Sequence, residues 1–142
     1  IALMPGAHCK RPDTLMDAPG AGAAGGTAFG LLSAAGAQLV PGSALVAAWL
    51  DLDARLAAAD LVLTGEGRFD ASSLAGKGPG AVIARARALG KRIHVFAGAA
   101  EPAATAPDGV TLQVITPPGT PHAIALRDAA ANLAHAVRVA FP

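Results

Sequence analysis

The sequence predicts an α/β protein in which helices flank a parallel sheet. Short apolar runs at Leu61–Leu63, Ile93–Ala97 and Leu112–Ile115 have the length and composition of buried strands. A stretch with helical spacing of apolar residues lies between the first two runs, and another follows the third. The order strand, helix, strand, loop, strand, helix is typical of a parallel sheet.

The first strand is expected to end at Thr64 and to lead into a loop rich in glycine and charge. Pro79 then marks the start of a helix, because proline is best tolerated in the first helical turn. Gly90 is expected to end this helix. The loop lies beyond the carboxyl end of a strand, which is where open α/β sheets bind ligands.

Helices are also expected on either side of this central region. Three short helices are predicted at residues 23–35, 44–50 and 53–59, with Trp49 of the second one in the core. The last helix is predicted to run from His122 to Val139. Its inward positions are expected to be Ala123, Leu126, Ala130, Leu133 and Val137.

Composition argues against several function classes. The chain has 142 residues and a formal net charge of +1, so no basic surface for nucleic acid or an acidic membrane is expected. One tryptophan, four phenylalanines and no tyrosine leave few platforms for base stacking. The single cysteine, Cys9, cannot form an intrachain disulfide, which agrees with a reducing cytoplasm. No apolar run approaches the roughly 20 residues of a membrane span.

The loop expected after Thr64 contains four charged side chains, Glu66, Arg68, Asp70 and Lys77. Exposed ion pairs contribute only about 0–1 kcal/mol, and each ordered glycine costs about 0.5–1 kcal/mol. Because this combination is poor for stability, it favours a functional loop. Glycine lets backbone N–H groups approach an anion, the two bases add positive charge, and the two acids can hold a metal or accept a proton. The alternative is a surface loop whose charges are solvated.

A second glycine-rich segment spans residues 19–26. Its Gly20-x-Gly22-x-x-Gly25 spacing matches the dinucleotide fingerprint, but no convincing strand precedes it and no acidic residue follows at the required distance. The segment is expected to open a helix, either with N–H groups facing an anion or with small residues that let two helices pack closely. A P-loop is excluded, because Ala71 and Gly78 occupy its required glycine and Ser/Thr positions.

Together, the two segments resemble the signature of the type I glycerate kinases. One block is Thr64-Gly65-Glu66-Gly67-Arg68-x-Asp70 followed by Gly76-Lys77-x-Pro79. The other, upstream at a compatible distance, is Pro19-Gly20-Ala21-Gly22-Ala23-Ala24-Gly25-Gly26. Two blocks in the right order are more specific than either alone. The resemblance begins at about Asp17 and spans less than half of a family member.

The resemblance implies two α/β domains, one of them flavodoxin-like and built from both ends of the full chain. Residues 60–142 would be the C-terminal half of the flavodoxin-like domain. Residues 1–59 would be the tail of an inserted α/β domain that carries the glycine-rich helix start. Because the chain starts at Ile1 rather than at methionine, a fragment, a processed product or an internal piece of a longer protein is expected. The missing N-terminal portion of the same enzyme is then an expected partner.

The activity implied by the resemblance is transfer of the ATP γ-phosphate to a hydroxyl of D-glycerate, with ATP and Mg²⁺ as cofactors. Asp70 is expected to orient or deprotonate the hydroxyl or to hold Mg²⁺, and Lys77 to neutralise charge on the phosphoryl group. Arg68 is expected to bind the glycerate carboxylate. Glu66 is a second candidate metal ligand. The expected cofactor-binding set consists of Gly20, Gly22, Gly25, Gly26, Gly65, Glu66 and Gly67.

Two other hypotheses remain open at this point, a truncated non-catalytic α/β fragment and a general nucleotide- or anion-binding domain. The sequence departs from the family at Ser72, where glutamine is usual. It also lacks the family's N-terminal Pro-Asp-Ser-Phe-Lys segment, which belongs to the same cleft. This polypeptide by itself is therefore expected to bind weakly or to be inactive.

Overall fold

The computed structural model describes residues 15–74 and 78–142. The chain forms two compact units, Ile1–Leu45 and Val46–Pro142. Within the described part of the chain, no helix combines the length and the apolar character needed to cross a membrane.

The first unit contains helix α1 (Thr27–Ala35), which follows a run of turns. Ala24, Gly25 and Gly26 have φ angles of 52°, 64° and 86°. These left-handed conformations are incompatible with a right-handed helix, and glycine adopts them most readily. The helix predicted from Ala23 therefore begins four residues later.

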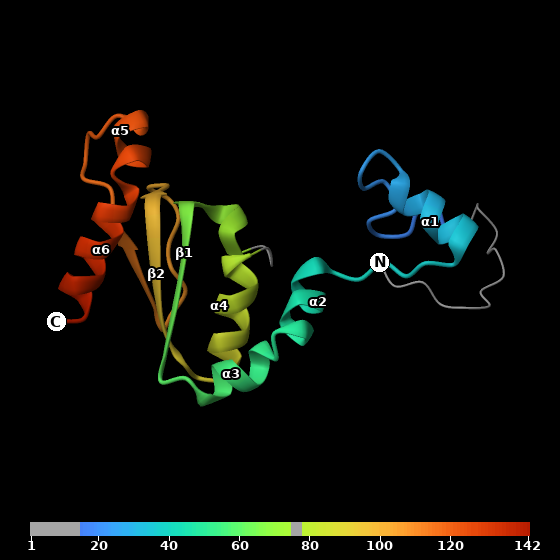
Figure 1. Ribbon diagram of the computed structural model, residues 1–142, viewed down its shortest axis with the longest axis horizontal. Helices are drawn as coiled ribbons and strands as arrows, with labels where there is room; N and C mark the ends of the chain where they lie inside the picture. The colour runs from blue at the N-terminus through green and yellow to red at the C-terminus, as the bar shows by residue number, and fades with distance from the viewer. Residues whose placement is uncertain (1–14, 75–77) are drawn as a thin grey trace. The chain divides into compact units, whose positions relative to one another are not determined.

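The second unit is an α/β arrangement in which the sheet lies between α4 on one side and α5 and α6 on the other (Figure 1). Its three strands are parallel and lie in the order β1-β2-β3, which confirms the predicted fold class. The elements after α1 are α2 (Gly42–Trp49), α3 (Leu52–Ala58), β1 (Leu61–Phe69), the 3-10 helix η2 (Ala71–Leu74), α4 (Pro79–Ala88), β2 (Arg92–Ala100), β3 (Val110–Val114), α5 (His122–Arg127) and α6 (Ala129–Ala140).

One core cluster joins α3 and α4 to the sheet. Its members are Leu56, Val62, Phe69, Ile83, Ala86, Ile93, Val95 and Ala97. Since Leu56 belongs to α3, this helix packs with the sheet although it precedes Asp60. The predicted boundary before Asp60 refers to the domains of a longer protein and stays a prediction.

Strand β1 is longer than predicted. The expected end at Thr64 is wrong, because Gly65 to Phe69 continue the parallel register with Phe96 to Ala100 of β2. Only residues after Phe69 connect this strand to α4. The helix start at Pro79 is confirmed. The glycine-rich sequence suggested a loop, but pairing with the neighbouring strand keeps the segment extended.

Two predictions about helices are also wrong. Trp49 is 75% exposed rather than in the core, because Ala47 is the buried position of α2 and a residue two positions later lies on the opposite side of a helix. The last helix is divided at Asp128 into α5 and α6. This break changes the inward face, so Leu126 is 65% exposed and Ala136 is buried.

Candidate active site

A change of face along β1 determines where the charged residues point. Val62 and Phe69 both belong to the core cluster, although residues seven positions apart on a regular strand lie on opposite faces. The change occurs among the glycines. A Cβ at Gly65 would lie 2.7 Å from the Phe96 carbonyl oxygen, so the side-chain direction there points at the neighbouring strand. Only glycine fits without a shift of the backbone.

Strand β2 changes face at the corresponding place. Ala97 is buried in the core and Ala100 packs against it, three positions later. Gly98 lies between them, and a Cβ there would lie 2.6 Å from the Gly67 carbonyl oxygen. In both strands, therefore, the alternation of side chains between the two faces of the sheet shifts at the same level. Beyond this point Phe69 faces the core, and Arg68 faces the side covered by α5.

A cavity of about 360 Å³ lies at the carboxyl ends of the three strands, under α5. We call it the α5 cavity. Each strand or the segment that directly follows it contributes to the wall, as do α5 and the start of α6. The lining residues are Glu66, Gly67, Arg68, Gly98, Ala99, Ile115, Thr116, Thr120, His122, Ala125, Leu126 and Ala129. This is the position at which open parallel sheets bind ligands.

Glu66 has a buried carboxylate oxygen that lacks a hydrogen-bond donor. Its Oε1 atom is sealed from solvent and has no partner within residues 15–74 and 78–142. A buried polar atom without a partner costs about 1–3 kcal/mol, and a charged one costs more. Glu66 also borders a second cavity of about 520 Å³, which is mainly apolar and is bounded by Phe96, Leu133 and Val137. Because Oε1 of Glu66 lacks a hydrogen-bond donor, Glu66 is a candidate residue for binding a ligand.

Arg68 is held by an ion pair at the rim of the α5 cavity. Its Nη2 atom lies 2.9 Å from Oε1 of Glu101, and the Arg68 side chain is 63% exposed. Glu101 in turn donates its backbone N–H to the Phe69 carbonyl oxygen at 2.9 Å. Because such an exposed pair adds little stability, its main effect is to orient the guanidinium group.

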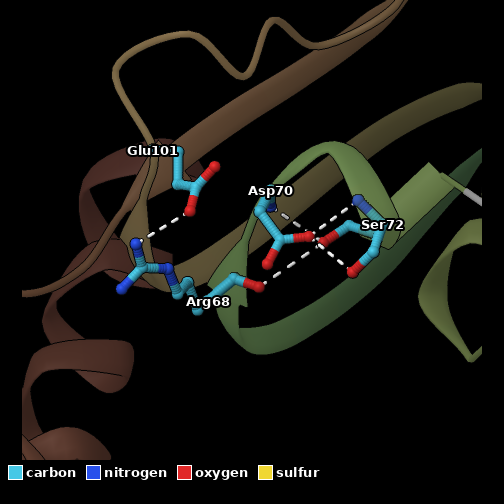
Figure 2. A network of polar contacts seen from close by, with 5 residues as sticks. Arg68, Asp70, Ser72 and Glu101 are labelled. Carbon is cyan, nitrogen blue, oxygen red and sulfur yellow. Dashed lines mark hydrogen bonds and ion pairs between the residues drawn. The ribbon is translucent and has the colours of Figure 1, made fainter.

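Asp70 follows the last residue of β1 and closes a tight turn. Its Oδ1 atom accepts hydrogen bonds from the Ser72 backbone N–H at 2.7 Å and from the Ser72 hydroxyl at 2.6 Å. Figure 2 shows the Asp70 carboxylate turned toward Ser72 and the Arg68 guanidinium turned toward Glu101. The Ser72 hydroxyl is the largest cause, and its N–H a further one, of a pKa below the ordinary 3.8 for Asp70. Asp70 is therefore ionised at neutral pH.

The structure brings together only some of the predicted site residues. Glu66, Gly67 and Arg68 line one cavity, whereas Asp70 lines none of the cavities described above. Lys77 lies outside the described residues. Gly65 has a packing role between β1 and β2, and its role as a backbone donor to a cofactor stays a prediction.

The glycine-rich segment before α1 belongs to the other unit. The backbone N–H groups of Gly26, Thr27 and Phe29 donate to carbonyl oxygens within that segment. They are therefore already used in shaping the turns. The predicted contributions of Gly20, Gly22, Gly25 and Gly26 to cofactor binding remain predictions.

Four further residues complete the neighbourhood of Arg68 and were absent from the predicted set. Glu101 follows β2, and Thr116, Thr120 and His122 follow β3. Their positions after the second and third strands could have indicated them, because the carboxyl ends of adjacent parallel strands meet at one edge of a sheet.

A magnesium ion would find few protein ligands here. The described ranges contain no cluster of three or more His, Cys, Asp or Glu side chains that could hold a metal. Magnesium commonly takes one or two carboxylates and completes its shell with water and phosphate oxygens. Glu66 and Asp70 fit that limited role as single carboxylates, and a shared role for the two stays a prediction.

The sequence matches the glycerate kinase family over residues 6–141. The chain belongs to the glycerate kinase family. The match begins before Asp17, where the resemblance was expected to start.

Several curated proteins, most of them named glycerate kinase, match a part of this sequence. Glycerate 2-kinase of Escherichia coli is 42% identical over 82 residues, which are 58% of this chain and 22% of that protein. An uncharacterized protein of Mycobacterium bovis is 50% identical over 80 residues, 56% of this chain and 21% of that protein. The chain thus spans about a fifth of the length of the curated relatives it matches.

A solved structure of the family shares the fold. It is the crystal structure of a "putative glycerate kinase 2" from Salmonella typhimurium LT2, which is 39% identical to this glycerate kinase family member. The TM-score is 0.56, over 80% of this chain and 29% of the solved chain. The similarity therefore extends over most of this chain, but the solved protein is much longer.

Proposed function

We propose that this chain supplies part of the active site of a glycerate kinase, which transfers the γ-phosphate of ATP to a hydroxyl of D-glycerate. The observation that carries the proposal is the placing of Glu66 and Arg68 in one cavity at the carboxyl ends of the strands. Membership of the glycerate kinase family and relatives named glycerate kinase support the choice of substrate. The proposal concerns the longer enzyme to which such a chain contributes.

The reaction requires positioning and charge neutralisation more than covalent catalysis. The glycerate hydroxyl oxygen forms a bond to the γ-phosphorus while the bond from that phosphorus to the bridging oxygen of ADP breaks. The bonding electron pair leaves with ADP, and the hydroxyl proton passes to a carboxylate or to water. In this proposal Arg68 binds the glycerate carboxylate with its planar fork of donors. Lys77 neutralises charge on the transferred group.

Asp70 has the properties of an acceptor that orients the hydroxyl. Its lowered pKa keeps the carboxylate ionised at neutral pH but makes it a weak base. A loose phosphoryl-transfer transition state needs little proton abstraction, so orientation or a single bond to Mg²⁺ suffices. When bound, Mg²⁺ would neutralise charge on the phosphate oxygens.

A chimeric enzyme tests this function directly. The matching segment of the Escherichia coli glycerate 2-kinase is replaced by the corresponding residues of this chain, and ADP release is followed with D-glycerate and ATP. We expect turnover that depends on D-glycerate. The 142-residue chain alone, assayed in parallel, is expected to give little or none. A chimera that unfolds as cooperatively as its parent but lacks glycerate-dependent turnover would favour a non-catalytic anion-binding role.

A further inference from the structure

We propose that the α5 cavity is the pocket for the acceptor, a small hydroxy-carboxylate, and that it does not hold the nucleotide. In this arrangement the acceptor carboxylate binds Arg68, and an acceptor hydroxyl other than the one that is phosphorylated donates a hydrogen bond to Glu66. The inference rests on the proposed kinase function and adds to it which substrate occupies this cavity.

The α5 cavity offers an anionic ligand one guanidinium group, that of Arg68. Among the residues that the structure describes, the charged ones in its lining are Arg68 and Glu66. Arg68 is also paired with Glu101 at 2.9 Å, so these described residues carry no excess of positive charge. A triphosphate needs several cations or a nest of backbone N–H groups, whereas one carboxylate needs a single guanidinium fork.

The unpaired oxygen of Glu66 matches a hydroxyl donor. Glu66 Oε1 has no donor in the described part of the chain, and a carboxylate can only accept hydrogen bonds when ionised. The terminal torsion of a glutamate is broad, so a small rotation can present either oxygen to the cavity. A ligand hydroxyl placed there would supply the bond that the protein leaves unmade.

The remaining walls suit a short polyhydroxylated carbon chain. Ile115, Ala125 and Ala129 give an apolar surface that limits access of water, and Thr116 and Thr120 add hydroxyl groups that can donate or accept. In the neighbouring cavity under α6, the described lining residues include one charged side chain, Glu66, and no cation. The combination of one cation, one unpaired acceptor and hydroxyls occurs at the α5 cavity.

A cavity-filling variant tests the inference in the chimeric enzyme described above. Ala125→Leu adds bulk to the wall without changing charge. We expect it to raise the KM for D-glycerate by about tenfold or more and to leave the KM for ATP unchanged. Ala131→Leu, at an exposed position of α6 that lines none of the described cavities, is the matched control and should change neither constant. If Ala125→Leu fails to fold, the same two KM values are measured for Thr116→Val, which removes a hydroxyl from the wall with little change of shape.

Two outcomes would overturn the acceptor pocket while the kinase function stands. One is a raised KM for ATP with an unchanged KM for D-glycerate, which would assign the cavity to the nucleotide. The other is an unchanged pair of constants in a folded Ala125→Leu enzyme. Calorimetric titration of D-glycerate, without nucleotide, into the chimeric enzyme and into its Ala125→Leu variant tests the acceptor pocket separately from the kinase function. Binding that is weakened by Ala125→Leu supports the pocket even where turnover is absent, and an absence of binding contradicts it.

Discussion

Val62 and Phe69 pack in one core cluster, although they lie seven residues apart on β1. Regular alternation would place them on opposite faces of the sheet. The glycines at positions 65 and 98 allow both strands to change face, because a Cβ at either position would collide with a carbonyl oxygen of the neighbouring strand. As a result Phe69 anchors the end of the strand in the core, and Arg68 is exposed at the rim of the α5 cavity.

Adding a methyl group at this change of face should destabilise the sheet. Gly65→Ala is expected to lower the free energy of unfolding by about 1–3 kcal/mol, because the new Cβ meets the Phe96 carbonyl oxygen. Gly67→Ala is the matched control, since a Cβ there meets nothing within 4 Å and φ is not positive. That change should be neutral or stabilising by up to about 1 kcal/mol. Urea denaturation measures both, and equal losses would contradict the account.

Two aromatic residues should differ sharply in their contribution to stability. Phe69 is completely buried, so Phe69→Ala is expected to cost about 3–5 kcal/mol. Trp49 is 75% exposed, so Trp49→Ala should change stability by no more than about 0.5 kcal/mol. Thermal and urea unfolding of the two variants give the comparison. A larger loss of stability for Trp49→Ala than for Phe69→Ala would indicate that Trp49 is a core residue.

The Ser72 hydroxyl should control the titration of Asp70. Because it is the largest cause of the lowered pKa, Ser72→Ala is expected to move the pKa of Asp70 back toward 3.8. The stabilisation linked to Asp70 is present above its unfolded-state pKa and is lost as pH falls through the folded-state pKa, so the variant should lose less stability on acidification. Carboxyl-carbon NMR measures the pKa. Asp128, whose pKa is lowered by Arg127, should not move and serves as the internal control.

Removing the guanidinium of Arg68 should affect acceptor binding and leave folding intact. In the chimeric enzyme, Arg68→Ala is expected to raise the KM for D-glycerate by about tenfold to a hundredfold, the range for a lost charged hydrogen bond. Arg127→Ala is the matched control, because Arg127 is also an exposed arginine in an ion pair but lines none of the described cavities. Steady-state kinetics for both substrates measure the effect. An equal response of the two variants would remove Arg68 from the acceptor site.

The order of strands and helices after residue 60 could be predicted, because short apolar runs and helical periodicity are local signals. The length of β1 could not. Gly65 to Phe69 resemble a loop when only local composition is considered, and their extended form depends on pairing with β2. The position of Trp49 failed for a similar reason, since a tryptophan is usually buried but α2 turns a different face inward.

The candidate site could be predicted only in part, because its residues come together through contacts between segments that are distant in the sequence. The sequence grouped four charged residues, Glu66, Arg68, Asp70 and Lys77. The structure places Glu66 and Arg68 at one cavity that Asp70 does not line, and Lys77 lies outside the described residues. The partner of Arg68 is Glu101, which is 33 residues away in the sequence and becomes its neighbour only through the parallel pairing of β1 and β2. The packing role of Gly65 was also hidden, because it depends on the carbonyl of another strand.

Turnover of an Asp70→Asn variant tests most directly the proposed role of the Asp70 carboxylate in phosphoryl transfer. Asparagine keeps the shape and can accept the same two hydrogen bonds from Ser72, but it loses the negative charge. In the chimeric enzyme, supplied with ATP and D-glycerate, we expect kcat to fall by about tenfold to a hundredfold, the range for a lost charged hydrogen bond, while the variant still unfolds cooperatively. Asp108→Asn, at an exposed position outside the α5 cavity, should keep full activity. Near-normal turnover by Asp70→Asn would contradict the proposed role of this carboxylate in phosphoryl transfer.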